Sequence, residues 1–226
     1  MIGVSEYLPV EYTGDVLNGL SDGNGYCTIE KGNTVIEYMG GFSEAAFNGY
    51  GELVLRDENE SYTIKGNFED GGFAPTYSEV ISNLSSVGQR YGEFVISDQV
   101  ADFIDKNEQV FLDDTIEITD IKEFSYKDFE KKRMQDEVGI VKLNLVVNQI
   151  FEDEWIATKT FDSDRYTSIL ATDNDYNYYV IYYWGTNDLH SGDRMTVYAV
   201  PVTTSSFENV SGGLTNNVVF IACRFE

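Results

Sequence analysis

Apolar residues in the middle of the chain recur every three or four positions, which is the spacing of one helix face. The run begins at Thr76-Tyr77-Ser78-Glu79, which has the form of a capping box with Thr76 at the N-cap and Glu79 three residues on. The apolar positions of this predicted helix are Tyr77, Val80, Ile81, Leu84, Val87 and Tyr91. Gly88 and Gly92 are expected to weaken or end it.

Two further helices are predicted before residue 138. The first opens at Ser97-Asp98, and its apolar face comprises Val100, Phe103, Ile104, Val110 and Phe111. The second spans 125–136, with Phe124, Phe129 and Met134 directed inward. It carries a cluster of basic residues, Lys127, Lys131, Lys132 and Arg133, which nearby acidic residues offset, so we interpret it as a solvated face. We therefore expect residues 76–137 to form a helical connector.

Residues 138–226 predict five β-strands, because apolar runs and alternating patterns are separated by turn residues. The second strand is expected to be broken into two parts. The predicted strands are Val138–Phe151, then Trp155–Phe161 with Tyr166–Thr172, then Tyr176–Trp184, Arg194–Val202 and Asn217–Phe225. Five short strands suit a small closed barrel, which leaves no exposed sheet edge.

The first 75 residues contain a period of 26 residues. Glycines coincide when the segment is aligned on itself, and so do the aromatic or apolar positions around them. The positions that match are Tyr12, Gly14, Val16, Gly19 and Gly25 in the first copy, Tyr38, Gly40, Phe42, Ala45 and Gly51 in the second, and Ile64, Gly66, Phe68 and Gly71 in the third.

Each copy is interpreted as a β-hairpin. The clusters Gly23-Asn24-Gly25 and Asn48-Gly49 allow positive φ, which tight hairpin turns need. A glycine two residues after a tyrosine leaves room for a ring from the next copy to lie on bare backbone. Because one hairpin cannot bury its own apolar face, the stacked copies must share a core.

The series Tyr12-Thr13-Gly14, Gly19 and Gly23-Asn24-Gly25, with its second copy Tyr38-Met39-Gly40 and Asn48-Gly49-Tyr50-Gly51, resembles the MORN repeat. The third copy, Ile64 to Phe73, lacks the tyrosine and ends early. The resemblance covers residues 12–73 and implies an accessory module for assembly or, in some proteins, for membrane contact. With only Lys31, Arg56 and Lys65 as cations, the segment does not favour anionic lipid.

The C-terminal run Gly192-Asp193-Arg194-Met195-Thr196-Val197-Tyr198-Ala199, followed by 207–213 and 218–221, resembles the closing half of OB-fold-like modules in uncharacterised bacterial proteins. In those modules a helical lead-in precedes the first strand, as 124–137 does here. Ala199 stands where glycine is usual.

The predicted fold class of the whole chain is mainly β with a helical connector (α+β). Its domains are MORN-like hairpins over 1–75, the connector over 76–137 and an OB-like barrel over 138–226.

The net charge of the chain limits the kinds of partner that it can bind. The chain has 15 Lys and Arg against 39 Asp and Glu, a net charge of −24, which repels phosphates and argues against nucleic acid. Its hydrophobic content of 42% can supply a core, so the chain is not disordered. No apolar run reaches the ~18 residues of a membrane helix, and residues 1–6 lack the features of a signal peptide.

The strongest candidate for ligand contact is the aromatic strand Tyr176–Trp184. Tyr178, Tyr182 and Trp184 share one face, and Tyr179 and Tyr183 share the other. One face of a barrel strand fills the core and the other looks outward, where aromatic rings can stack on sugars or peptides. The alternative interpretation is that these rings pack against the connector or the repeats.

Other chemistry has little support. Asp173-Asn174-Asp175 begins like a calcium loop but has Tyr178 at the glycine position and Trp184 at the glutamate position, so a solvated turn is expected. His190 is the only histidine and is assigned to a loop. No cysteine and histidine cluster could hold zinc, no phosphate-binding loop is present, and no cofactor or metal is predicted.

These patterns favour a non-enzymatic binding or scaffolding protein whose partner is another protein, or a second copy of the chain that pairs through the sheet edge. The alternative is an extracellular glycan- or peptide-binding module, which requires an exposed cluster among the barrel aromatics. The ligand, the oligomeric state, the compartment and the biological process stay open, as does the pairing of Cys27 with Cys223. A signal or anchor upstream of Met1 would place the protein at the cell surface.

Overall fold

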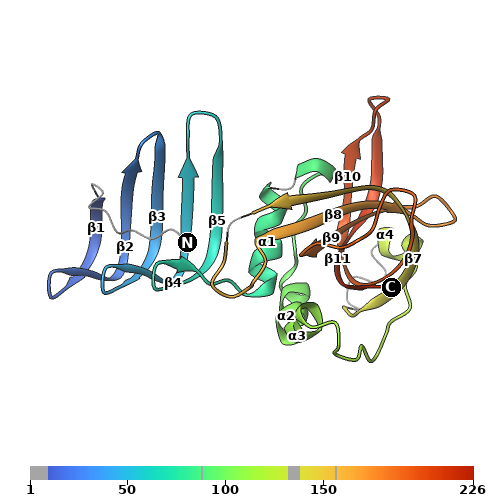
Figure 1. The fold of residues 1–226 in the computed structure, drawn as a ribbon, viewed down its shortest axis with the longest axis horizontal. Coiled ribbons are helices and arrows are strands. Elements are labelled where there is room, and N and C mark those ends of the chain that lie inside the picture. Colours follow the sequence, from blue (N-terminus) through green and yellow to red (C-terminus); the bar gives the residue numbers. More distant parts are fainter. Residues whose placement is uncertain (1–9, 88, 132–137, 156) are drawn as a thin grey trace. The chain divides into compact units, whose positions relative to one another are not determined.

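The chain is mainly β, with two separate sheets and helices that lie between them in sequence, as the sequence predicts (Figure 1). The structure is a computed structural model that describes residues 10–87, 89–131, 138–155 and 157–226. Two compact units are present. One comprises residues 1–83 with 156–162, and the other comprises 84–155 with 163–226.

The first unit is a six-stranded antiparallel sheet in which every strand pairs with its neighbours in the sequence. Its strands are β1 (Val10–Leu17), β2 (Leu20–Lys31), β3 (Thr34–Ser43), β4 (Ala46–Arg56), β5 (Ser61–Glu69) and β6 (Gly72–Phe73). The short β6 agrees with the early end of the third copy. Each 26-residue copy thus supplies two strands, and consecutive hairpins join edge to edge.

One row of glycines crosses five of these strands. Gly14 pairs with Gly25, Gly25 with Gly40, Gly40 with Gly51, and Gly51 with Gly66. The matching glycines of the three copies therefore occupy equivalent positions. A Cβ on Gly25 would lie 2.5 Å from Cε2 of Tyr12, so the bare backbone is where this ring rests.

The second copy repeats this packing, with Tyr38 lying over Gly51. The hydroxyl of Tyr38 donates to the carbonyl of Gly41, as Tyr12 donates to Asp15 three residues on. In each case the ring belongs to the same copy as the glycine on the adjacent strand. The expectation that the ring comes from the next copy is therefore wrong.

The hairpin turns also differ from the prediction. Gly23-Asn24-Gly25 and Asn48-Gly49 lie inside β2 and β4, beside irregular pairing at Gly14 and Gly40 rather than at turns. The turn within each copy lies instead at one of three matching dipeptides in which both residues have positive φ: Asn18-Gly19, Glu44-Ala45 and Asp70-Gly71. The backbone N–H of Ala45 donates to Ser21, and that of Gly71 donates to Phe47, so the copies are also joined in the same way.

The helix α1 (Tyr77–Val87) follows the last strand of the sheet in the sequence. The capping box is confirmed: the Thr76 hydroxyl accepts from the N–H of Glu79, and the Glu79 carboxylate accepts from the N–H of Thr76. The same carboxylate accepts from the backbone and side chain of Asn67 and lies beside Gly66. The Glu79 side chain therefore lies next to Gly66, the third glycine of the repeat. In this copy Ile64 replaces the tyrosine of the other two copies.

The second unit is a closed five-stranded barrel. Its strands are β7 (Val141–Glu154), β8 (Arg165–Thr172), β9 (Tyr178–Trp184), β10 (Arg194–Glu208) and β11 (Leu214–Phe225). The order is β7-β8-β9-β11-β10 and back to β7, and only β9 and β11 run parallel. The described residues of the predicted strand at 155–161, namely 155 and 157–161, form no strand. Lys159 in this segment bonds to Phe73 instead, within the first unit.

The helical region is more broken than predicted. The second predicted helix divides at Asn107 into α2 (Asp98–Lys106) and α3 (Glu108–Leu112), because the Asn107 side chain and N–H take the carbonyls that end α2. In the described part of the third, the helix is α4 (Tyr126–Glu130), capped by Ser125. The predictions for Gly88, Lys132, Arg133 and Met134 lie outside the described residues.

The barrel interior is apolar and continuous. Alternate residues of all five strands meet there, among them Leu145, Ile169, Ile181, Val197 and Phe220. Phe129 of α4 belongs to the same cluster and is 4% exposed, and Phe124 packs beside it. The predicted inward direction of both rings is confirmed, and the Phe124 ring, which precedes α4, contacts those of Tyr179 and Phe220.

Candidate functional site

The aromatic residues of β9 that the sequence marks for ligand contact belong to the core. Tyr182 is 0% exposed, Tyr179 3% and Trp184 6%, while Tyr178 and Tyr183 are half-buried. Tyr179 and Tyr183 face the barrel interior, and the other three lie on the outer face. Both faces of the strand are therefore covered.

The outer face is covered by the segment after α1 and by Trp155, which follows β7. The Phe94 ring lies 4.9 Å from that of Tyr182, and the Trp155 ring lies 5.6 Å from that of Trp184. Tyr91 of the short 3-10 helix η1 (Gln89–Tyr91) packs on Phe207. Burial raises the pKa of Tyr91 to about 12. The glycan or peptide alternative requires an exposed aromatic cluster, and these residues do not provide one.

Asp173 sits in the β8–β9 turn and is a structural residue. Its carboxylate accepts hydrogen bonds from the N–H groups of Asp175 and Asn177, from the Asn177 side chain and from the Tyr179 hydroxyl. Burial opposes ionisation of Asp173, but these bonds outweigh it, so its pKa is lowered. The calcium-like sequence is therefore a turn whose first carboxylate is satisfied internally.

The remaining sequence candidates are accounted for. His190 is exposed in a loop, as predicted, and its ring nitrogen lies 3.0 Å from the carbonyl of Asp188. Cys27 and Cys223 are buried and unbridged, and burial raises the pKa of the Cys223 thiol to about 12. In the described part of the chain, no group of three His, Cys, Asp or Glu residues is placed to hold a metal.

The open edge of the sheet is a first candidate surface. Among the described residues no strand pairs with the outer side of β1, which is the end strand of the sheet (Figure 1). Apolar side chains are exposed there: Val16 is 60% exposed, Leu17 58% and Leu20 47%. A row of unpaired backbone groups beside exposed apolar residues is a surface on which another strand can pair.

The repeat explains why this edge is incompletely packed. Tyr38 contacts three rings, Phe42, Phe47 and Phe68, with centroid distances of 5.2, 3.9 and 5.0 Å. One period earlier, Tyr12 keeps one such ring, Phe42 at 5.0 Å, and the positions equivalent to the other two rings are Val16 and Ser21, which have no ring. Tyr12 is accordingly half-buried, whereas Tyr38 is fully buried.

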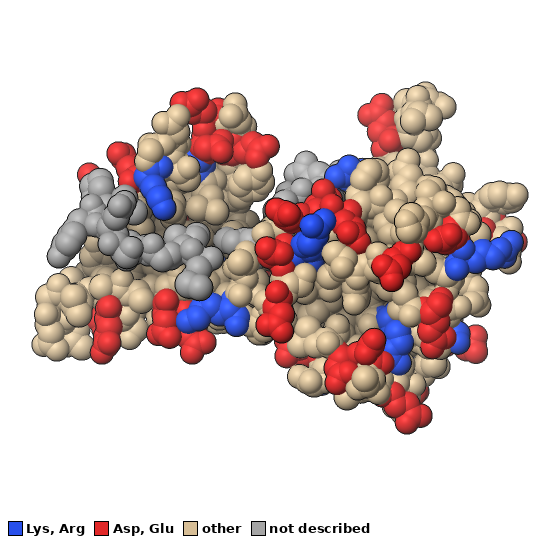
Figure 2. Space-filling view, viewed as in Figure 1, with Lys and Arg blue, Asp and Glu red and all other residues tan. Residues whose placement is uncertain are grey.

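The edge is acidic. β1 and β2 carry Glu11, Asp15, Asp22 and Glu30, and their one cation is Lys31. Acidic side chains are also spread over both units on the face shown in Figure 2. An approaching basic segment would be attracted to this edge, and a second acidic chain would be repelled.

A polar cleft in the barrel unit is a second candidate. Its volume is about 470 Å³, in the range of small-ligand sites. The cleft is lined by Glu93, Tyr126 and Glu130, by Thr204, Ser205 and Ser206 of β10, and by Asn216 and Asn217 of β11. The Ser205 hydroxyl donates to the carbonyl of Glu93, which fixes one wall.

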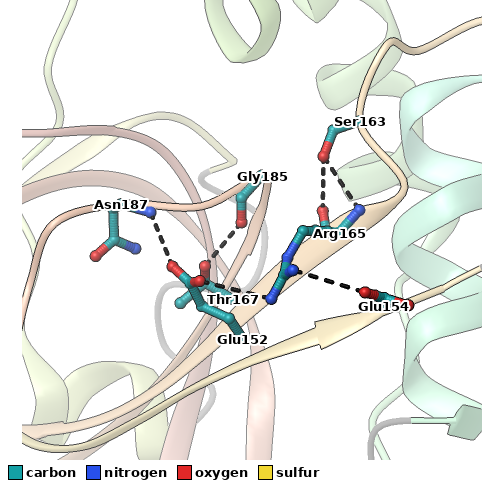
Figure 3. Close-up of polar contacts among 7 residues, drawn as sticks. All are labelled: Glu152, Glu154, Ser163, Arg165, Thr167, Gly185 and Asn187. Carbon is teal, nitrogen blue, oxygen red and sulfur yellow. Dashed lines mark hydrogen bonds and ion pairs between the residues drawn. The ribbon is translucent and has the colours of Figure 1, made fainter.

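A third polar cluster lies around Arg165 (Figure 3). Its guanidinium is 3.8 Å from Glu152 and 3.7 Å from Glu154, and Thr167 donates to the carbonyl of Gly185. The two carboxylates neutralise the arginine, so the cluster offers no anion site. It holds the ends of β7, β8 and β9 together.

The repeat predicts an open sheet edge, but sequence reasoning did not identify the apolar residues exposed there, and it missed the cleft. The edge had a signal, because Val16 of the first copy stands where Phe42 and Phe68 stand in the others. The cleft had almost none, since its polar residues come from four separate segments. The described residues contain no helix long and apolar enough to span a membrane. Comparison of the chain with protein-family models, with curated proteins and with solved structures found no match.

Proposed function

We propose that this chain is a non-enzymatic binding protein, and that it recognises a partner by accepting an extended, basic segment beside β1. The observation that carries the proposal is the open edge of the sheet, where Val16 and Leu17 are more than half exposed. An added strand would satisfy the free backbone groups of β1 and cover these side chains. This role requires complementary surfaces and no chemical step.

We also propose that the sheet is a MORN-like repeat and that the barrel is OB-like. The row of five glycines with tyrosine rings resting on it supports the first assignment. A three-strand meander, a parallel pair of third and fifth strands, and closure of the fourth strand on the first support the second. A scaffold built from such modules fits a binding role.

Charge favours a basic partner over a second copy. Two β1 edges brought together would place Glu11 and Asp15 of one chain near those of the other, in molecules of net charge −24. A strand that alternates apolar and basic residues would meet both the apolar and the acidic side chains of this edge.

The test is fluorescence anisotropy at low ionic strength with a labelled octapeptide of alternating lysine and valine. The matched peptide replaces each lysine with glutamate. We expect the lysine peptide to bind and the glutamate peptide to bind far more weakly. Val16→Lys should weaken binding about fivefold, while Val210→Lys, the same change at a fully exposed valine of the barrel unit, should leave binding unchanged.

Two results would overturn this proposal. One is equal binding of the two peptides, or of the two variants. The other is a concentration-dependent doubling of mass in sedimentation that Val16→Lys abolishes, which would make a second copy the occupant of the edge.

A further inference from the structure

The polar cleft of the barrel unit contains a buried amide that lacks partners. Asn217 is 1% exposed, and neither its Oδ1 nor its Nδ2 has a hydrogen-bond partner among the described residues. Its backbone is engaged, because Asn217 pairs with Tyr178 on β9 and with Ser205 on β10. Leaving both polar atoms of a buried amide unsatisfied is costly, so the side chain has a use that the fold does not explain.

The charged side chains that line the cleft favour a positively charged ligand. Two carboxylate residues, Glu93 and Glu130, contribute to it, and no Lys or Arg does so among the described residues. The other lining residues supply hydroxyl and amide groups. The two carboxylates would repel an anion, and a purely apolar ligand would leave the polar groups unpaired, whereas a cation with its own hydrogen-bonding groups would be matched.

The two atoms of the Asn217 amide define the second requirement. Oδ1 accepts a hydrogen bond and Nδ2 donates one, side by side. A peptide group presents the complementary pair, an N–H and a carbonyl. A simple amine offers donors alone and would leave Nδ2 unsatisfied.

We propose that this cleft binds a lysine residue of a peptide, with the ammonium group directed to Glu93 and Glu130 and a flanking peptide group paired with Asn217. The volume of about 470 Å³ suits one long side chain with its adjoining backbone. The Tyr126 hydroxyl, which donates to the carbonyl of Asn216 at 3.5 Å, fixes the wall beside this position. The site lies in the barrel unit and is independent of the β1 edge, so either proposal can fail without the other.

The experiment uses the full chain and two blocked tripeptides, acetyl-Gly-Lys-Gly-amide and its norleucine counterpart, which lacks only the ammonium group. Binding is measured by calorimetry and by the NMR shifts of the Asn217 side-chain NH₂. We expect the lysine peptide to shift these signals and to bind at least about tenfold more tightly than the norleucine peptide. Spermidine, which has ammonium groups but no peptide group, should bind more weakly than the lysine peptide.

Two sets of variants separate binding from folding. Asn217→Leu removes the unpaired amide at similar volume, so it should leave the stability of the fold unchanged or raised while weakening the lysine peptide about tenfold. The double variant Glu93→Gln with Glu130→Gln should weaken the lysine peptide by a similar factor. The matched control is Glu117→Gln with Glu123→Gln, at two exposed residues of the same unit, and should have no effect.

The proposal is overturned if norleucine or spermidine binds as tightly as the lysine peptide. It is also overturned if the lysine peptide does not bind, or if the variants at Glu93 and Glu130 bind it as well as the control does. Should Asn217→Leu fail to fold, the paired glutamate variants and the two peptides still decide the result.

Discussion

The sheet and the barrel are both antiparallel for the most part, but they are closed in different ways. In the sheet every strand pairs with the next along the chain, and no strand of the described residues pairs with the outer side of β1. In the barrel the last two strands pair with earlier ones: β10 pairs with the first strand, β7, and β11 pairs with the third, β9. The sheet is therefore built from local pairings, and the barrel depends on pairings between residues far apart in the sequence.

Their cores differ for the same reason. The barrel encloses its apolar residues on all sides, and Phe129 fills its interior from outside the strands. A single sheet has no such enclosure, so it buries Tyr38 against the bare backbone of Gly51 and between the rings of Phe47 and Phe68. Packing between successive copies can bury side chains without a closed barrel, but the first copy has no copy before it, so Tyr12 stays half-buried.

The largest expected effect is that of Gly51→Ala. The added Cβ would lie 2.6 Å from Cε2 and Cζ of Tyr38, whose ring is fully buried and stacked 3.9 Å from that of Phe47. We expect the sheet to lose about 3 kcal/mol of stability. The measurement is urea unfolding followed by circular dichroism and, separately, by fluorescence of Trp155 and Trp184, both of which lie in the barrel unit.

The two signals test whether the units unfold separately. We expect the circular dichroism transition to shift and the tryptophan transition to stay in place. A common shift would mean that the sheet and the barrel unfold as one, and the contrast between them would not extend to stability. Gly213→Ala is the control, because a Cβ there meets only ordinary contacts of 3.4 Å or more and no positive φ is involved.

The sheet was the more predictable of the two units. The 26-residue period placed Gly14, Gly40 and Gly66 at equivalent positions, because a repeat carries its own register. It did not place the turns, since glycine clusters serve bulges as well as turns, and Glu44-Ala45 carries no glycine to mark one. The predicted strand is absent from the described residues 157–161, where Lys159 bonds to Phe73 instead, a long-range contact that an alternating pattern does not contain.

The apolar runs of the sequence locate the barrel strands. They do not show which residues cover each face of a strand. Phe94 covers Tyr182 from a loop almost ninety residues away, so the pattern of β9 could not separate an exposed ring from a buried one. The cleft was invisible for the same reason. Glu93, Glu130 and Asn217 meet only because the folded chain brings three segments together.

An effect of intermediate size is expected at a barrel turn. Asp173→Asn should cost about 1.5 kcal/mol near pH 7, because the charged acceptor of four hydrogen bonds is lost. The pKa of Asp173 is lowered in the folded state, so its contribution is present above the unfolded pKa of ~3.9 and is lost as pH falls through the folded pKa. The difference between the variant and the parent should therefore shrink below about pH 4.

Urea unfolding followed by tryptophan fluorescence, at neutral and acidic pH, measures this difference. Asp175→Asn is the matched control in the same turn, because Asp175 is exposed and contributes its backbone N–H. Equal effects of the two substitutions, or a difference that persists at acidic pH, would show that the barrel turn does not depend on the Asp173 charge. The contrast with the turns of the sheet, which depend on backbone φ, would then be lost.

The smallest effect concerns one of those turns. Ala45 has a φ of 69°, and the matching residues of the other copies are Gly19 and Gly71, with φ of 85° and 77°. The left-handed region costs a residue with a Cβ about 1–2 kcal/mol, and glycine gives back part of this through its greater freedom in the unfolded chain. Ala45→Gly should therefore stabilise the sheet by about 0.5–1 kcal/mol.

The reverse change, Gly71→Ala, should destabilise the sheet by a similar amount. A Cβ at Gly71 meets no atom within 4 Å, so this substitution changes only the backbone preference. Circular dichroism of the urea transition reports both changes. Opposite signs of similar size would show that equivalent turns of the repeat obey one backbone rule. If Ala45→Gly is neutral or destabilising, the turn at Glu44-Ala45 is held by its own surroundings, and the copies are equivalent in register but not in energy.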